Sequence, residues 1–153
     1  MFDLIKLNSI YHIASSGVEE IEKINILQAS LLSMKRACEG VINQIQEQNI
    51  KILIDGNKLI PKFSVTQEYV IKGDSKSASI AAASILAKVT RDHFMKDLAK
   101  EFPNYGWDSN KGYLTPNHLQ AIDRYGLTKW HRKKFLEKHF EKSEQIRLSL
   151  PIG

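Results

Sequence analysis

Apolar residues recur at steps of three and four in two long stretches of the chain, and this spacing predicts two long helices. The first is expected to run from Asn25, a good N-cap residue, to about Gln48. Its apolar face consists of Leu27, Leu31, Met34, Cys38, Val41, Ile42 and Ile45. The second is expected from Ser75 to Phe102, and its many alanines would allow close packing against a sheet.

Short apolar runs predict three strands. Residues 51–57 are apolar until Asp-Gly-Asn interrupts them, a pattern typical of a strand that is buried on both faces. Residues 69–74 repeat this pattern. Residues 9–15 alternate β-branched or aromatic residues with smaller ones, which also favours a strand. Strands that alternate with helices indicate an α/β layered domain.

The C-terminal third combines a polar, aromatic loop with two helices. The loop covers residues 104–113, and the helix after it is expected to begin with Thr115 as N-cap and Pro116 at its first position and to end at Gly126. A basic helix over about residues 131–141 should follow. The loop aromatics suit either stacking on a sugar or base or packing back onto the core, and both alternatives stay open. They are Tyr105, Trp107 and Tyr113.

Composition narrows the class of protein. With 153 residues, 42% of them hydrophobic, the chain is expected to form one domain. The single cysteine excludes an internal disulfide scaffold and a thiolate zinc cage, and its place on an apolar helix face suits a core residue. There is no apolar run near the ~20 residues that span a bilayer, and residues 1–6 do not resemble a signal peptide. We therefore expect a cytoplasmic protein without a membrane partner.

Basic residues outnumber acidic ones by 22 to 17, which favours a polyanionic partner such as nucleic acid. Many of them cluster near the C-terminus, where they could contact a phosphate backbone or form an ordinary solvated helix face. This basic patch comprises Lys129, Arg132, Lys133, Lys134, Lys138 and Lys142. His118 and His131, close to the same helices, are expected to be packing or hydrogen-bonding residues.

Two aspartates follow predicted strands. Ligands of open α/β sheets gather outside the carboxyl ends of the strands, so Asp55 and Asp74 could face one site. Converging carboxylates favour a hard divalent cation such as Mg²⁺, which suggests metal-assisted chemistry on phosphate. The alternatives are a turn residue for Asp55 and a helix N-cap for Asp74. Residues 72–77 could form an anion site at the helix start, or an ordinary solvated one.

Five segments, taken in order, closely resemble ribonuclease HII from about Phe2 to Phe135. They are Ile-Asp-Gly-Asn at 54–57, Val-Ile-Lys-Gly-Asp-Ser at 70–75, Ala-Ala-Ala-Ser-Ile-Leu-Ala-Lys-Val-Thr-Arg-Asp at 81–92, Tyr-Gly-Trp at 105–107 with Asn-Lys-Gly-Tyr at 110–113, and His-Arg at 131–132. The resemblance implies a ribonuclease H-like mixed sheet flanked by helices. It also implies an endonuclease that cuts the RNA strand of RNA–DNA hybrids and single ribonucleotides embedded in DNA, leaving a 5′-phosphate and a 3′-hydroxyl.

The resemblance also implies roles for individual residues. Asp55 matches the third and Asp74 the fourth of four catalytic carboxylates, which bind Mg²⁺ or Mn²⁺. Tyr113 matches the tyrosine that packs on the sugar at the RNA–DNA junction. Further substrate contacts are expected from the same motifs, at Asn57, Lys72, Ser75 and Lys111. Asp92 falls in the Thr-Arg-Asp segment and is expected to have a structural role.

The chain departs from the family at its start. A first strand with Gly-Ile/Val-Asp-Glu, and the Gly-Arg-Gly loop after it, have no match; residues 17–20, Gly-Val-Glu-Glu, look superficially similar but are interpreted as a solvated acidic turn. The family's strand order is 3-2-1-4-5, so the two central strands would be missing between the strands near Ile10 and Ile54. We therefore expect an incomplete core over about residues 1–128 and a basic C-terminal helix and tail over 129–153.

Such a sheet predicts an unstable or aggregation-prone product, a monomer if folded, with impaired cleavage because two carboxylates hold the metals poorly. A start upstream of Met1, a decayed reading frame and a fragment would each explain the pattern. The alternative function is a catalytically inactive remnant that binds nucleic acid through Lys72, Lys76, Lys111 and the basic patch. Residues 145–148 resemble the start of a sliding-clamp-binding peptide but lack its aromatic pair.

Overall fold

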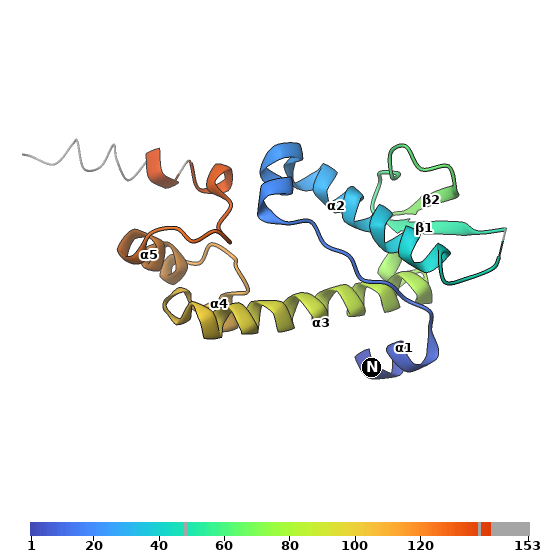
Figure 1. The fold of residues 1–153 in the computed structure, drawn as a ribbon, viewed down its shortest axis with the longest axis horizontal. Coiled ribbons are helices and arrows are strands. Elements are labelled where there is room, and N and C mark those ends of the chain that lie inside the picture. Colours follow the sequence, from blue (N-terminus) through green and yellow to red (C-terminus); the bar gives the residue numbers. More distant parts are fainter. Residues whose placement is uncertain (48, 138, 142–153) are drawn as a thin grey trace, which may run out of the picture.

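Helix α3 (Ala78–Glu101) connects two separate parts of the molecule, a small sheet at one end and a group of short helices at the other (Figure 1). The computed structural model describes residues 1–47, 49–137 and 139–141. The other elements are α1 (Phe2–Asn8), α2 (Val18–Ile42), β1 (Lys51–Asp55), β2 (Thr66–Val70), η1 (Gly73–Ser75), η2 (Pro103–Tyr105), α4 (Trp107–Asn110) and α5 (Pro116–Tyr125). Residues 133–137 and 139–141 are also helical. No helix in the described ranges is both long and apolar enough to cross a bilayer.

The sheet of the described chain consists of β1 and β2, which pair in parallel from Lys51 opposite Thr66 to Asp55 opposite Val70. This confirms an α/β domain. Strand β2 begins and ends earlier than the predicted 69–74, because residues 71–75 turn away from the ladder and form η1.

The strand predicted over residues 9–15 is wrong. These residues are extended but belong to no ladder. Side chains of α2 take their backbone carbonyls instead: Gln44 Nε2 donates to Tyr11 O over 3.4 Å, and Arg36 Nη1 donates to Ser15 O over 3.2 Å. The His12 ring lies so close to Gly40 that a Cβ there would come within 2.2 Å of it. The alternating pattern therefore produced an extended strap along a helix.

Helix α2 bends at Asn25, whose backbone has a φ of 66°. The Asn25 side chain accepts a hydrogen bond from Gln28 N over 3.1 Å, so it caps the second part of the helix as the sequence predicted. The helix nevertheless starts seven residues earlier, at Val18, and ends at Ile42, before the predicted Gln48.

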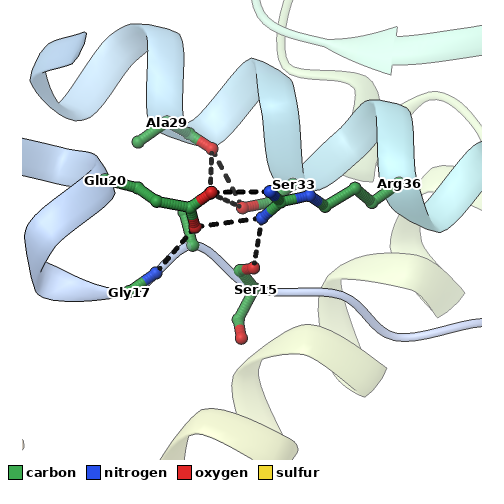
Figure 2. A network of polar contacts seen from close by, with 7 residues as sticks. Ser15, Gly17, Glu20, Ala29, Ser33 and Arg36 are labelled. Carbon is green, nitrogen blue, oxygen red and sulfur yellow. Dashed lines mark hydrogen bonds and ion pairs between the residues drawn. The ribbon is translucent and has the colours of Figure 1, made fainter. Parts of the chain in front are cut away.

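A polar network holds the first turn of α2 against its second part (Figure 2). Arg36 makes a two-point contact with Glu20, at 2.6 and 3.0 Å, and Glu20 also accepts from Gly17 N over 3.1 Å. The hydrogen bond from Arg36 lowers the pKa of Glu20. The interpretation of residues 17–20 as a solvated acidic turn is therefore wrong, since this segment opens a helix and its second glutamate is paired.

The apolar residues form two cores at opposite ends of α3. The smaller lies under α2 and contains Leu31, Ile54 and Ile60, with Cys38 packed against it as predicted. The larger lies between the end of α3 and the C-terminal helices. It contains Met95, Leu98, Tyr105, Trp107, Ala121, Ile122 and Leu136. The helix from Thr115 to Gly126 forms as predicted, with the Thr115 hydroxyl accepting from His118 N.

Strand β1 is not buried on both faces, contrary to prediction. Ile54 is buried, but Leu53 on the opposite face is 37% exposed. Gly56 N donates to Val70 O, so the backbone groups of residues 52 and 54 face β2, and those of 51, 53 and 55 face the outer edge. No backbone hydrogen bond from that outer edge occurs in the described part of the chain.

We expect this open edge to drive self-association, because unpaired strand edges template further pairing. Leu53→Lys should reduce the concentration-dependent increase in apparent mass measured by sedimentation velocity. Ile26→Lys, which replaces an exposed apolar residue of α2, is the matched control and should leave self-association unchanged. An equal reduction by both variants would attribute association to general surface hydrophobicity.

Candidate functional site

Asp55 lies at the end of β1 and is held against the segment that follows β2. Its Oδ1 accepts a hydrogen bond from Gly73 N over 2.8 Å. The contact requires glycine: a Cβ at residue 73 would lie 2.6 Å from Ile80 Cδ1 and 3.3 Å from Asp55 Oδ1. Asp55 is therefore more than a local turn residue, since its carboxylate connects the ends of both strands.

Asp74 follows Gly73 directly, so the hydrogen bond from Gly73 brings the two aspartates to one edge of the sheet. Asp74 Oδ1 accepts from Ser75 N over 2.9 Å, and both aspartates are exposed. The N-cap of α3 is Ser77, so the alternative that made Asp74 the helix N-cap is wrong. Two solvent-facing carboxylates can accept a cation or a proton at this edge.

The anion site predicted at residues 72–77 does not form as expected. Helix α3 starts only at Ala78, and nearby oxygens already accept the backbone N–H groups of Gly73, Ser75, Lys76 and Ser77. The Ser75 hydroxyl donates to Lys72 O over 2.9 Å. The exposed side chains of Lys72 and Asn57 remain beside the aspartates as possible phosphate contacts.

The donor set suits a metal that protein and substrate hold together. In the described ranges, no group of three or more His, Cys, Asp or Glu side chains is arranged to hold a metal ion. Mg²⁺ commonly binds through one or two carboxylates, several waters and substrate phosphate. The pair Asp55 and Asp74 fits this mode, and an all-protein cage does not fit.

The aromatic loop divides between the core and the surface, so each alternative holds for part of it. Tyr105 and Trp107 are buried and stack on each other with ring centroids 5.2 Å apart. Tyr113, in contrast, is 70% exposed. Of the three aromatics, only Tyr113 is available to a ligand.

Lys111 and Tyr113 lie at the far end of α3 from the aspartates (Figure 1). Arg91 Nη2 donates to Lys111 O over 3.2 Å, which anchors the loop to α3. Arg91 is thirteen residues beyond Ala78, or about 20 Å along the helix axis. The structure therefore groups Asn57, Lys72 and Ser75 with the aspartates and places Lys111 and Tyr113 elsewhere.

Positive charge gathers around this loop. Burial, and then the nearby Arg91, lower the pKa of Arg132, which places two guanidinium groups close together. Asp92 is partly buried and engaged by Lys88 Nζ over 2.5 Å, which fits the structural role expected for it. Sequence reasoning did not single out Arg91, although its Thr-Arg-Asp motif was the available signal.

His118 and His131 are buried and hydrogen-bonded, as predicted. Their Nε2 atoms are 3.2 Å apart, and Trp107 Nε1 donates to His118 Nε2 over 3.1 Å. Burial, and then the neighbouring His118 ring, lower the pKa of His131 to about 4. The pair is therefore neutral near pH 7 and forms the polar centre of the larger core.

The basic patch is only partly a free surface. Lys134 Nζ donates to Glu22 O over 2.7 Å, and Glu22 Oε1 accepts from the backbone N–H groups of Lys133 and Lys134. These contacts attach α2 to the C-terminal helix. Lys129 lies over the Trp130 ring, 5.2 Å from its centroid. Lys138, Lys142 and the proposed clamp-binding segment 145–148 lie outside the described residues.

Comparisons with known proteins agree on one family. The family model of ribonuclease HII matches residues 4–143. The chain is similar to ribonuclease HII of Pelagibacter ubique (strain HTCC1062), with 56% identity over 131 residues, 86% of this chain and 68% of the relative. It is also similar to ribonuclease HII of Fusobacterium nucleatum subsp. nucleatum, with 44% identity over 146 residues, 95% of this chain and 68% of the relative. For ribonuclease HII of Christiangramia forsetii the identity is 48% over 125 residues, 82% of this chain and 61% of the relative.

The chain thus spans roughly two thirds of the length of these curated relatives. The aspartates joined through Gly73 and the exposed Tyr113 both lie inside the matched residues. Sequence, fold class and motif order agree, and the chain belongs to the ribonuclease HII family.

Proposed function

We propose that this chain carries part of an endonuclease site that hydrolyses the RNA strand of RNA–DNA hybrids and cuts at ribonucleotides embedded in DNA, leaving 5′-phosphate products. The observation that carries the proposal is the hydrogen bond from Gly73 N to Asp55 Oδ1, which places Asp55 and Asp74 at one edge of the sheet. Membership of the ribonuclease HII family supports the substrate class.

Asp55 and Asp74 would hold Mg²⁺ or Mn²⁺ together with a substrate phosphate. The metal would supply Lewis acidity at the phosphoryl oxygen and lower the pKa of bound water. The chain's own contribution is to orient the two carboxylates. Gly73 fixes Asp55 through its N–H, and the η1 turn presents Asp74 beside it. Lys72 adds a positive charge next to the same phosphate position.

A duplex lying along α3 would reach both ends of the proposed site. The separation of about 20 Å corresponds to about six base pairs at 3.4 Å each. One end would then receive the scissile phosphate, and the other would meet the backbone at Lys111 and the sugar at Tyr113. The charges of Arg91 and Arg132 favour a polyanion at that second end.

Cleavage by residues 1–153 is expected to be slow. Four carboxylates are expected in the complete family site, and only two of them are matched in this sequence. Fewer anionic ligands bind the metals less tightly and orient the attacking water less well. The described outer edge of β1 is also unpaired, which leaves the sheet that supports Asp55 weakly held.

Asp55→Asn tests the proposal directly. Purified protein is incubated with Mn²⁺ and a DNA duplex that contains one ribonucleotide, and Mn²⁺ binding is measured in parallel by calorimetry. We expect Asp55→Asn to abolish whatever cleavage occurs and to weaken Mn²⁺ binding by at least about tenfold, since even indirect partners of metal ligands change affinity by 10–100-fold. Asp92→Asn is the matched control and should leave Mn²⁺ binding unchanged.

Two results would contradict the proposal. One is folded protein whose Mn²⁺ affinity is the same with and without Asp55. The other is duplex binding that weakens steeply with salt, needs no divalent cation and shows no preference for a ribonucleotide. The second result would identify the alternative function, an inactive remnant that binds nucleic acid through its basic residues.

A further inference from the structure

We propose that His118 is a positioning residue: its Nδ1–H holds the backbone carbonyl of Tyr113 and thereby sets where the exposed Tyr113 ring meets the substrate. Tyr113 O lies 3.0 Å from His118 Nδ1. The ring of Tyr113 is 70% exposed, whereas the His118 side chain is among the most buried polar groups. The substrate contact of Tyr113 rests on the proposed function, but the positioning of its carbonyl does not.

The hydrogen bonds of His131 determine its tautomer. Thr128 N donates to His131 Nδ1 over 2.9 Å, so this ring nitrogen is an acceptor. A neutral imidazole carries one proton, which must then be on Nε2. The ring is neutral at pH 7 because burial lowers the pKa of His131 far below that pH. His131 Nε2 therefore donates to its neighbour His118 Nε2.

The same reasoning determines the tautomer of His118. Its Nε2 lies 3.2 Å from the His131 Nε2 donor and 3.1 Å from Trp107 Nε1, an indole group that can only donate. An atom that faces two donors is an acceptor, so His118 carries its proton on Nδ1. That proton points to Tyr113 O. The network thus converts two buried donors into one fixed donor at the loop.

The loop needs this anchor because its other constraints are local. Thr115 N donates to Tyr113 O and Tyr113 N donates to Asn110 O, both over 2.9 Å, and these bonds stay within the same turn. Lys111 and Gly112 before Tyr113 both adopt positive φ angles. Among the described residues, His118 is the only side chain that hydrogen-bonds the backbone of Tyr113. It ties the loop to the buried core through α5.

Two near-isosteric variants separate the two ring nitrogens. The side-chain amide of asparagine can take the place of His118 Nδ1, and that of glutamine reaches the place of Nε2. His118→Asn keeps a donor for Tyr113 O and loses the acceptor for Trp107 and His131. His118→Gln keeps that acceptor and loses the donor for Tyr113.

The first measurement needs no variant. Nitrogen-15 NMR of the His118 ring at pH 7 should show a protonated Nδ1 and an unprotonated Nε2, and the opposite tautomer would overturn the proposal. The carbonyl carbon-13 shift of Tyr113 should then change in His118→Gln and stay near the wild-type value in His118→Asn. An unchanged Tyr113 shift in folded His118→Gln would also overturn it.

Binding to a duplex with an RNA–DNA junction tests the consequence. His118→Gln should weaken binding by about fivefold, the factor of one hydrogen bond, and His118→Asn should stay within about twofold of wild type. Adding His118→Gln to Tyr113→Ala should cause no further loss, and additive losses would overturn the link between the two residues. If Tyr113→Ala alone leaves binding unchanged, the substrate contact fails, and the NMR results still decide whether His118 positions the carbonyl.

Discussion

Trp107→Ala is expected to lower the free energy of unfolding by about 3–5 kcal/mol, the usual loss when a fully buried large aromatic side chain is removed. Trp107 is 2% exposed and packs against the rings of Tyr105, Phe102 and His131, with centroids 5.2 to 5.6 Å away. Its Nε1–H also bonds His118. Urea denaturation followed by far-ultraviolet circular dichroism measures the change.

Two control variants separate packing from hydrogen bonding in this prediction. Trp107→Phe keeps a ring in the core and loses only the N–H, and since His131 Nε2 still donates to His118, we expect a clearly smaller loss than with alanine. Trp130→Ala removes a partly buried ring at the edge of the same core and should also cost less. A loss near 1 kcal/mol for Trp107→Ala would show that the C-terminal helices do not form the main core.

Acidification from pH 7 to pH 4 is expected to destabilise the protein through His131. The unfolded pKa is about 6.5 and the folded pKa about 4, so between these values the unfolded chain binds the extra proton. The contribution of this group is fully present above pH 6.5 and is lost as the pH falls towards 4. The difference of about 2.5 units corresponds to about 3 kcal/mol. Denaturation midpoints measured at several pH values follow it.

The matched control for this pH effect is His131→Asn. Its side-chain oxygen can still accept from Thr128 N, but the variant has no imidazole to titrate. Carboxylates paired in the folded state also lose stability in acid, and this contribution is shared by both proteins. The wild type should therefore lose more stability than His131→Asn between pH 6.5 and 4. Parallel pH profiles would show that the buried histidine is already charged when folded, or that it is solvated.

Much of the fold could be predicted from local pattern. The helix starts at Asn25 and Thr115, and the parallel neighbours β1 and β2, follow from capping residues and from short apolar runs. The strand predicted over residues 9–15 does not form, because a strand exists only through its partner. Here the side chains of Gln44 and Arg36 take the carbonyls that a neighbouring strand would have taken.

The candidate site divides in the same way. Motif spacing by itself picked out Asp55, Asp74 and Tyr113, and the family membership that gives them meaning. It could not foresee that the N–H groups of residues 73, 75, 76 and 77 are already occupied, since this depends on how the chain turns after β2.

What the sequence by itself determined is the family, the type of each main helix and the two aspartates, because these depend on residues that are near neighbours in the chain. Only the tertiary structure decided that Trp107 and Tyr105 are core residues while Tyr113 faces solvent, and that His118 and His131 share protons around a buried indole. The physical reason is that burial and tautomer are set by groups brought together from distant parts of the chain. Local periodicity carries no information about those partners.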